Sequence, residues 1–364
     1  MSGNRRLPQR SKMWYTICHF TLAFSVFSCA SAAPKPLRFN EDGMFRMVQF
    51  TDLHYGENPD SDWGPIQDIN STIVMHKILD TEENVDLVVF TGDQMTGENF
   101  AANNASLYVK QMLEPTVLRS IPFASIYGNH DHSSAYFTAK DIYNAEKRHG
   151  GDLVRTQLGN ISGYGNYYLP ILPPIVMENG FTNKNQTTPA AILWFFDTHG
   201  RQGRNWIKSD QVAWFRAQST RLCAQHGSIP SFAFFHIPVA AHREDNTRAD
   251  FENICEGFRD EPGAIAIQDG DEGFAAALAG SSLPVLASFS GHDHGTGWCC
   301  EGPSGSGLET MQLCFGKHTG YGGYGSWDRG ARVIELNAWR LPRWKTWIRM
   351  ENATVVYPSE FHRR

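Results

Sequence analysis

Five short apolar runs, each followed at once by side chains that can bind a metal ion, constrain the fold of this chain most. Unbroken runs rich in Val, Ile and Phe are typical of strands buried on both faces. In open α/β sheets, ligands bind at the carboxyl ends of such strands. The sequence therefore predicts that the following side chains meet at one edge of a sheet: Asp52 and His54 after 47–50, Asp93 after 85–90, Asn129, His130 and Asp131 after 122–127, His236 after 232–235, and His292 and His294 after 285–290.

Helical patterns alternate with these runs. The order strand, helix, strand predicts right-handed crossovers and a mainly parallel core sheet. Helices are predicted over 66–81, 105–118 and 135–149, and from Ser209 as N-cap through Cys223.

The rest of the chain does not continue this alternation of buried strands and helices. Residues 241–273 are polar and acidic with little periodicity, which predicts a long surface loop. Residues 333–336 and 346–349 alternate between apolar and polar and predict antiparallel strands. With no internal repeat and no linker, residues 33–364 are predicted to form one domain.

The first 32 residues have the order of a secretory signal peptide. Four basic residues between Arg5 and Lys12 precede an apolar stretch at about 13–28, and small residues lead to Ala32. A membrane anchor fits less well, because the apolar part is shorter than the ~20 residues of a span. We expect cleavage after Ala32, no stable membrane anchor, and a secreted, extracellular or vacuolar protein.

The charge balance argues against a nucleic-acid partner. The formal net charge is −6, and removal of the basic leader makes the mature chain more acidic. An acidic surface repels a polyanion, although bound metal ions can reverse the potential locally.

Five Asn-x-Ser/Thr sequons support the secretory route independently of the leader. Together with a signal peptide they favour a glycosylated eukaryotic protein. The sequons are at Asn70, Asn104, Asn160, Asn185 and Asn352.

The predicted mature chain has five cysteines, so one thiol is left over in an oxidising compartment. Cys299 or Cys300 is expected to pair with Cys314 across a Gly-rich loop. A weaker expectation pairs Cys223 with Cys255. A zinc site made of cysteines is disfavoured, because the spacing lacks paired CxxC motifs.

Asp and His side chains bind hard and borderline divalent cations. Asp93 stands alone after its strand and is the candidate bridge between two ions. Two ions about 4 Å apart can clamp a phosphate, hold a hydroxide at neutral pH and stabilise the charge of an in-line displacement. We expect Asp52, His54 and His294 on one metal, and Asn129, His236 and His292 on the other.

His130 is left outside this ligand set. It is placed to hydrogen-bond the phosphate or to protonate the leaving alkoxide, with Asp131 as its orienting partner. His132 is expected in an outer shell or in the substrate pocket, and Asp197 and His199 are expected to be structural.

Each candidate taken alone has a simpler explanation. Asp52 or Asp93 alone fits a turn or a cap. His236 alone, after four apolar residues, fits a buried core histidine, and an isolated His-x-His pair is weak evidence. The joint order of five motifs, each at a strand end, favours the metal site.

That joint order carries a resemblance to a known family. The series Asp52-x-His54, Gly92-Asp93, Gly128-Asn129-His130-Asp131, His236 and Gly291-His292-Asp293-His294 resembles the calcineurin-like metallophosphoesterase superfamily. The Gly- and Tyr-rich tail at 313–333 looks like a small, single-domain purple-acid-phosphatase-like branch. The resemblance implies an α/β fold, a four-layer sandwich of two packed mixed β-sheets flanked by helices, and hydrolysis of phosphoric esters at a dinuclear centre.

Two positions depart from the purple enzymes. Their Tyr ligand, three residues after the bridging Asp, is replaced here by Thr96, and His54 stands where they usually have Gly. We therefore expect two divalent or mixed-valence ions of Fe, Mn or Zn, and no purple colour.

The expected function is a secreted phosphatase that hydrolyses small phosphate monoesters by attack of a metal-bound hydroxide. The alternatives are a phosphodiesterase or nucleotide phosphatase with the same centre, because selectivity lies in the loops. A glycoprotein that binds metal without turnover is a further alternative.

Overall fold

The computed structural model describes residues 34–362 apart from residues 176, 179–180, 183–186, 201–204 and 262, together with Met1 and Gly3. The chain divides into two units, Met1–Ala32 and Ala33–Arg364. The sheets and helices described here belong to the second unit. The sequon at Asn185 and nearly all of the predicted signal peptide lie outside the described residues.

A six-stranded sheet holds the first three predicted strands. Its strands are β1 (Met44–Phe50), β2 (Leu87–Thr91), β3 (Phe123–Ile126), β13 (Gly330–Asn337), β14 (Trp344–Met350) and β15 (Val355–Phe361). Their order is β15-β14-β13-β1-β2-β3. The strands β1, β2 and β3 run parallel, and β13, β14 and β15 extend the sheet as an antiparallel meander.

A seven-stranded sheet holds the later strands. They are β4 (Tyr167–Ile171), β7 (Ala191–Phe196), β8 (Ser231–Phe235), β9 (Cys255–Arg259), β10 (Val285–Ser290), β11 (Thr296–Glu301) and β12 (Gln312–Phe315), in the order β4-β7-β8-β10-β12-β11-β9. The inner strands β7, β8, β10 and β12 are parallel, and β4, β11 and β9 are antiparallel to their neighbours. A separate hairpin pairs β5 (Met177–Glu178) with β6 (Phe181–Thr182).

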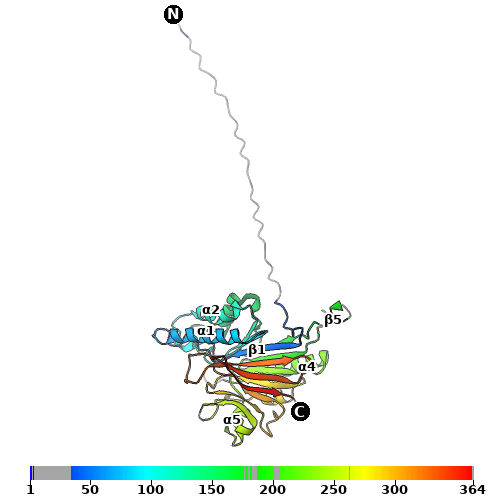
Figure 1. The fold of residues 1–364 in the computed structure, drawn as a ribbon. Helices are drawn as coiled ribbons and strands as arrows, with labels where there is room; N and C mark the ends of the chain where they lie inside the picture. Colours follow the sequence, from blue (N-terminus) through cyan, green and yellow to red (C-terminus); the bar gives the residue numbers. More distant parts are fainter. Residues whose placement is uncertain are drawn as a thin grey trace. The chain divides into compact units, whose positions relative to one another are not determined.

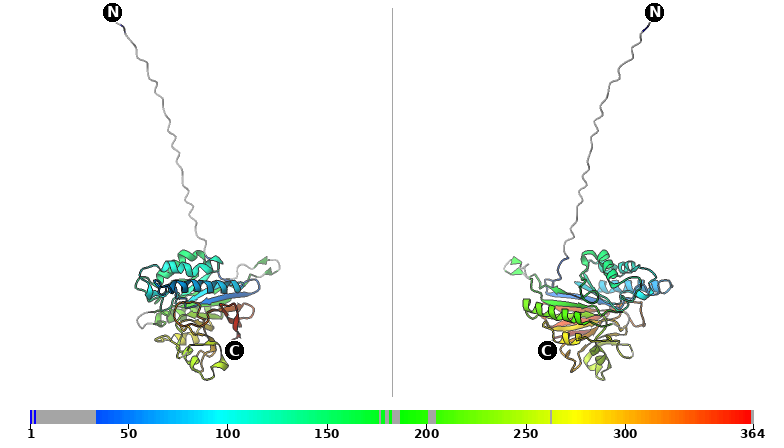
Figure 2. Two further views of the ribbon diagram at one scale, coloured as in Figure 1. Left: turned by 60° about the vertical axis from the view of Figure 1, so that its left-hand side comes forward. Right: turned by 180° about the vertical axis from the view of Figure 1, so that it is seen from behind.

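Helices cover the outer face of each sheet. They are α1 (Gly64–Thr81), α2 (Ala105–Leu118), α3 (Ala139–Gly150), α4 (Ser209–His226), α5 (Ala240–Thr247), α6 (Phe251–Ile254) and α7 (Phe274–Ala279), with short 3₁₀ turns η1 (Gly97–Asn99) and η2 (Gly151–Leu153). Figure 1 shows α1 and α2 on one side of the strand β1, and α5 on the far side of the layers. Figure 2 shows the same arrangement from two further sides, with α4 against the second sheet.

Three apolar clusters define the layers. One joins α1, α2 and α3 to the first sheet, and one joins α4 and α7 to the second sheet. The third lies between the sheets and includes Met47, Val89, Phe195, Phe234 and Phe289. Burial of this apolar surface is the main force that holds the layers together. The prediction of two packed mixed sheets flanked by helices is confirmed.

The predicted surface loop at 241–273 is wrong, because this segment holds α5, α6 and β9. The helices are only 8 and 4 residues long, too short to show a clear period. They are held by tertiary packing, since Ala241 and Phe251 are buried in the core of the second sheet. The strand β9 is an edge strand paired with β11.

Three helix starts differ from the prediction, and α1 begins at Gly64 rather than at residue 66. Helix α3 begins at Ala139 because Thr138 and Asp141 form a capping box. The N-cap of α4 is Lys208, and Ser209 is the first helical residue.

Two disulfides tie β11 to its neighbours. Cys299 pairs with Cys314 of β12, and Cys300 pairs with Cys255 of β9. The expectation that Cys299 or Cys300 pairs with Cys314 is confirmed, with Cys299 as the partner. The Cys223–Cys255 pairing is wrong, and Cys223 is a free thiol. Each disulfide joins residues directly opposite in the strand register, a relationship that depends on the sheet order.

Candidate metal centre

The carboxyl ends of five strands meet at one place and bring the predicted side chains together. The ends of β1, β2 and β3 come from the first sheet, and those of β8 and β10 from the second. Ligand-competent atoms lie within 4.8 Å of one another in three groups: Asp52, His54 and His294; Asp93, His236 and His292; and His54, Asp93 and His130. The first two groups match the two ligand sets expected from the sequence, without Asn129.

Asp93 lies between the two sets. Its Oδ2 atom is 2.9 Å from Nε2 of His236 and 3.9 Å from Nε2 of His54. Its Oδ1 atom accepts a hydrogen bond of 2.8 Å from the backbone N–H of His130. One carboxylate oxygen therefore faces both sets while the other is anchored, which is the arrangement that a bridging ligand needs.

Asp52 lies beside the two histidines of the first ligand set, His54 and His294. Its Oδ1 atom lies 3.7 Å from Nε2 of His294, and the Nε2 atoms of His294 and His54 are 3.2 Å apart. The carboxylate accepts hydrogen bonds from the hydroxyl of Thr51 at 2.8 Å and from the backbone N–H of His292. These bonds fix Asp52 before any cation binds.

Backbone carbonyls set the direction of two histidine rings. Nδ1 of His236 donates to the carbonyl of Thr91 at 2.8 Å, and Nδ1 of His294 donates to the carbonyl of Tyr324 at 2.8 Å. A neutral imidazole that donates from Nδ1 carries its lone pair on Nε2. In His294, which burial keeps neutral, Nε2 therefore directs a lone pair toward Asp52. Nε2 of His236 lies 2.9 Å from Oδ2 of Asp93 and would bind a cation after losing its proton.

The polar atoms fit two divalent cations. Oδ1 of Asn129 is buried and has no hydrogen-bond partner in the described part of the chain. Carboxylate, amide and imidazole groups together suit Zn, Mn or Fe ions. Asp52, His54, His294, Asp93, Asn129, His236 and His292 would hold them.

Burial keeps three histidines neutral. Desolvation lowers the pKa of His54 to about 4 and that of His292 to about 3, and it also lowers the pKa of His294 strongly. Neutral imidazole is the form that binds metal ions.

The pKa values of Asp93 and His236 are set by the contact between these two groups more than by their burial. Burial would raise the pKa of Asp93, but the neighbouring histidines, His236 above all, hold it well below its usual value. Burial would lower the pKa of His236, but the Asp93 carboxylate outweighs it and raises the pKa to about 10. Asp93 is therefore ionised across the physiological range.

Four candidate ligands have strained backbone. Asp52, His54, Asp93 and His292 have positive φ angles of 55°, 51°, 47° and 79°. Such conformations are uncommon for residues other than glycine and cluster at functional sites. The motif glycine Gly128 allows a close approach, because a side chain there would overlap Oδ1 of Asp93.

His130 is paired with Glu98, a residue that the sequence motifs did not indicate. Nδ1 of His130 lies 2.5 Å from Oε1 of Glu98, and both side chains are partly exposed beside Asp93. Burial would lower the pKa of His130, but Asp93 and Glu98 outweigh it and raise the pKa to about 9.

The expected orienting role of Asp131 needs correction. Its buried carboxylate accepts hydrogen bonds from the backbone N–H groups of Gly128, Gln94 and Met95. Asp131 therefore holds the loops after β2 and β3 against each other. Glu98 takes the place beside the His130 ring that was expected for Asp131.

Thr96 supports His54 rather than the metal. Its Oγ1 lies 3.0 Å from Nδ1 of His54. The side chain that stands in place of the Tyr ligand of the purple enzymes thus orients the imidazole that stands in place of their Gly. Thr96 and His54, the two positions that depart from the purple enzymes, are therefore in direct contact.

The Gly-rich tail passes directly over His294. The Tyr324 ring stacks on the His294 ring with centroids 4.0 Å apart, and its hydroxyl contacts Glu261 at 2.7 Å. A side chain at Gly323 would overlap both His294 and His54. Neither Tyr324 nor Glu261 was predicted, since their role depends on a loop path that sequence spacing does not specify.

His132, Asp197 and His199 form a network behind Asn129. Nε2 of His132 lies 3.1 Å from Oδ1 of Asp197, and this oxygen also accepts the backbone N–H of His199. Gly200 packs against the backbone of Asn129. These contacts position the loop after β7 and are consistent with the structural role expected for Asp197 and His199.

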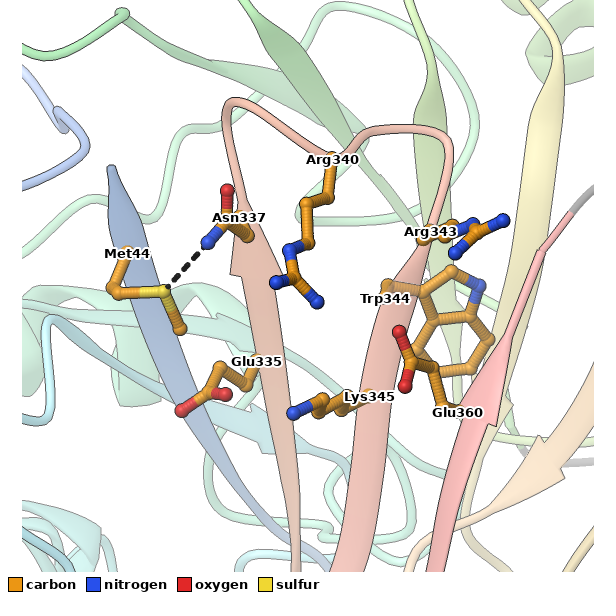
Figure 3. Close-up of a pocket in the computed structure, with 8 residues that line it drawn as sticks. All are labelled: Met44, Glu335, Asn337, Arg340, Arg343, Trp344, Lys345 and Glu360. Atoms are coloured by element: carbon orange, nitrogen blue, oxygen red, sulfur yellow. Dashed lines mark hydrogen bonds between the residues drawn. The ribbon is translucent and has the colours of Figure 1, made fainter. Parts of the chain in front are cut away.

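A surface pocket of about 200 Å³ lies at the turn between β13 and β14, away from these strand ends. Figure 3 shows Arg340 and Lys345 on its walls, with Asn337 hydrogen-bonded to Met44. Met44 is at the start of β1, whereas Asp52 follows its end. The pocket is therefore at the opposite end of the sheet from the metal centre.

The chain belongs to the calcineurin-like phosphoesterase family, whose model matches residues 45–295. This match spans every candidate ligand. The resemblance inferred from the five motifs is thereby confirmed.

Particular relatives fit the same picture. The Arabidopsis thaliana protein called probable inactive purple acid phosphatase 29 is 30% identical over 91% of this chain and 91% of its own length. A dimetal phosphatase from Danio rerio has a similar fold, with a TM-score of 0.55, 15% identity, and coverage of 88% of this chain and 99% of that one. A purple acid phosphatase from yellow lupin seeds gives a TM-score of 0.51 at 12% identity, covering 91% of this chain and 55% of that one.

None of the helices in the described part of the chain has both the length and the apolar character that a bilayer span requires.

Proposed function

We propose that this protein is a secreted, metal-dependent phosphatase that hydrolyses small phosphate monoesters. The observation that carries the proposal is Oδ2 of Asp93, which faces His236 on one side and His54 on the other, with His130 and Glu98 beside it. This places a bridging group and a proton donor within one cluster of side chains.

The protein's own residues supply binding, orientation and a proton. When bound, two cations would neutralise a phosphate and acidify a coordinated water. Asp52 and Asp93 hold the ligand cluster, anchored by Thr51 and by the backbone of His130. Glu98 engages Nδ1 of His130, so Nε2–H is free to donate to the substrate.

His130 is suited to act as the general acid. Without bound cations, Asp93 and Glu98 raise the pKa of His130. The contact with Glu98 favours a protonated ring, and the leaving alkoxide of a phosphate ester needs that proton. The carboxylate of Glu98 fixes the ring orientation through the 2.5 Å contact.

Catalysis is favoured over passive metal binding. Three Arabidopsis relatives carry the word inactive in their names, and a protein that binds metal without turnover is the corresponding alternative. A ligand-competent side chain is present at every position of the expected set in this chain, and His130 is present beside them. Loss of selection for turnover would be expected to remove at least one of these groups.

The secretory route rests on independent features. The leader has the order of a signal peptide, and the disulfides Cys255–Cys300 and Cys299–Cys314 are of the kind that persist in oxidising compartments.

The function is tested by assaying protein purified from a secretory host. Hydrolysis of p-nitrophenyl phosphate should exceed that of bis-p-nitrophenyl phosphate and ATP, and should stop when metal is removed by a chelator. A preference for the diester would support a phosphodiesterase with the same centre. Absence of turnover on all three esters in metal-replete protein would support the non-catalytic alternative.

A further inference from the structure

Helix α1 is apolar on two opposite faces. Val74, Met75 and Ile78 point inward and are buried in the cluster beneath the helix. Ile66, Ile69 and Ile73 are 53%, 53% and 44% exposed. Residues three and four apart share one face of a helix, so these three isoleucines form a single outer row.

The row extends beyond the start of the helix. Trp63, which precedes α1 and lies three residues before Ile66, is 43% exposed. Four large apolar side chains are thus exposed along one side of this helix and its start, and large exposed apolar patches often mark places where something binds. We define the apolar row as Trp63, Ile66, Ile69 and Ile73.

Asn70 lies within the apolar row. It is four residues after Ile66 and three before Ile73, so its side chain belongs to the same face. It is partly exposed, and Asn70-Ser71-Thr72 is a glycosylation sequon. A polar residue that carries an acceptor signal thus stands in the middle of an exposed apolar surface.

We propose that Asn70 carries an N-linked glycan whose core sugars cover the apolar row. The side-chain amide nitrogen bonds to the anomeric carbon of the first sugar and loses one proton. The bond from that carbon to the polyprenol diphosphate of the lipid-linked oligosaccharide donor breaks, and the diphosphate leaves. This transfer precedes folding, and the folded helix leaves Asn70 on its outer side.

The chemistry of the sugar suits the apolar row. Pyranose rings present C–H groups on their faces, which pack on an indole ring such as that of Trp63 and on aliphatic side chains. Asn70 is two helical turns from Trp63, about 10 Å along the axis, which is within reach of the first two sugars. A glycan at Asn70 would block a second copy of the chain from docking on this face, so the two occupants exclude each other and the test below distinguishes them.

The other described sequons provide natural controls. Asn160 and Asn352 are exposed and lie outside the helices. Asn104 precedes α2, and its side-chain oxygen is buried. Only Asn70 among these four stands within the apolar row.

The inference rests on the secretory route proposed above, but not on catalysis. If the route fails, no sequon will carry sugar. If only this inference fails, Asn160 or Asn352 will carry sugar and Asn70 will not.

The test uses the full chain made in a secretory eukaryotic host. Peptide mass spectrometry measures occupancy at each sequon. N70Q and the control N160Q are compared by light scattering during size exclusion and by binding of an apolar dye. The triple variant N70Q/I69E/I73K replaces two members of the apolar row by a pair that can interact at i and i+4.

We expect Asn70 to be glycosylated. N70Q should bind several-fold more dye than wild type and should self-associate with rising concentration, whereas N160Q should behave as wild type. The triple variant should return dye binding and mass to the wild-type values. If N70Q is not secreted, rescue of secretion by the triple variant would equally show that the glycan at Asn70 covers the apolar row.

Three results would overturn the proposal. They are an unmodified Asn70 in secreted protein, an N70Q variant indistinguishable from N160Q, and a triple variant that fails to correct the N70Q defect.

Discussion

Nδ1 of His130 lies 2.5 Å from Oε1 of Glu98, which comes from the turn after β2 rather than from the motif that contains His130. The two residues are 32 positions apart in sequence. This contact makes Glu98 the group that orients the proposed proton donor.

Removing the charge of Glu98 should move the pH dependence of the reaction. Glu98 raises the pKa of His130, so Glu98→Gln should lower it. A general acid works while it is protonated, and activity is lost as the pH rises through its pKa. The alkaline limb of the rate profile should therefore shift to lower pH by about one unit. Glu114→Gln, which breaks the surface pair of Glu114 with His76, should leave the profile unchanged, and an unshifted limb in Glu98→Gln would remove Glu98 from this role.

Truncation of His130 should separate catalysis from metal binding. His130→Ala should retain both metal ions and lose roughly 10²–10⁴-fold in rate, the range for a lost general acid. The loss should be larger for alkyl phosphates than for p-nitrophenyl phosphate, whose phenolate leaves with little help. His76→Ala serves as the surface control. Equal losses on both kinds of ester would leave His130 only a positioning role, and loss of one metal equivalent would make it a ligand.

Protein loaded with iron should lack an intense visible charge-transfer band. Thr96 stands in place of a phenolate ligand and bonds to His54. Tyr55 is the tyrosine nearest in sequence to the candidate ligand His54. Its hydroxyl is hydrogen-bonded to Thr72 at 2.8 Å within the core. An absorption spectrum of the iron form tests this, and a strong purple band would show that a tyrosine reaches the metal.

Glu146 should make the protein less stable as the pH rises. It is fully buried, and burial raises its pKa to about 7 from a usual 4.5. The folded state therefore holds the proton more tightly than the unfolded state, and stability is lost between pH 4.5 and 7. Glu146→Gln should remove this loss and gain roughly 3 kcal/mol of unfolding free energy over wild type above pH 7.

Urea unfolding of metal-replete protein at pH 5 and pH 8 measures this difference. The exposed Glu83→Gln serves as control. A gain that is the same at both pH values would show that Glu146 is not the titrating group.

The sequence could predict where the candidate ligands lie because each follows a short, strongly apolar run that forms a buried strand. Asp52, Asp93 and His236 sit one or two residues beyond β1, β2 and β8, so their convergence follows once those strands form parallel sheets. At these sites the local apolar pattern is enough to predict where the side chain lies in the fold.

Other features depended on tertiary structure. The Cys255–Cys300 pairing requires β9 to lie beside β11, and β9 is a short edge strand with no alternating pattern. Glu98 and Tyr324 reach His130 and His294 only through loop paths. No spacing rule marks such residues, since their partners are brought close by the packing of the two sheets.

We propose that Asp93 would bridge two cations in a centre that hydrolyses phosphate esters. The most direct measurement titrates Mn²⁺ or Zn²⁺ into metal-free protein while recording p-nitrophenyl phosphate turnover and bound metal per chain. Turnover should saturate at two equivalents, and Asp93→Asn should bind less metal and show no turnover. Two bound ions without turnover in wild type, or wild-type turnover with two ions in Asp93→Asn, would contradict the account.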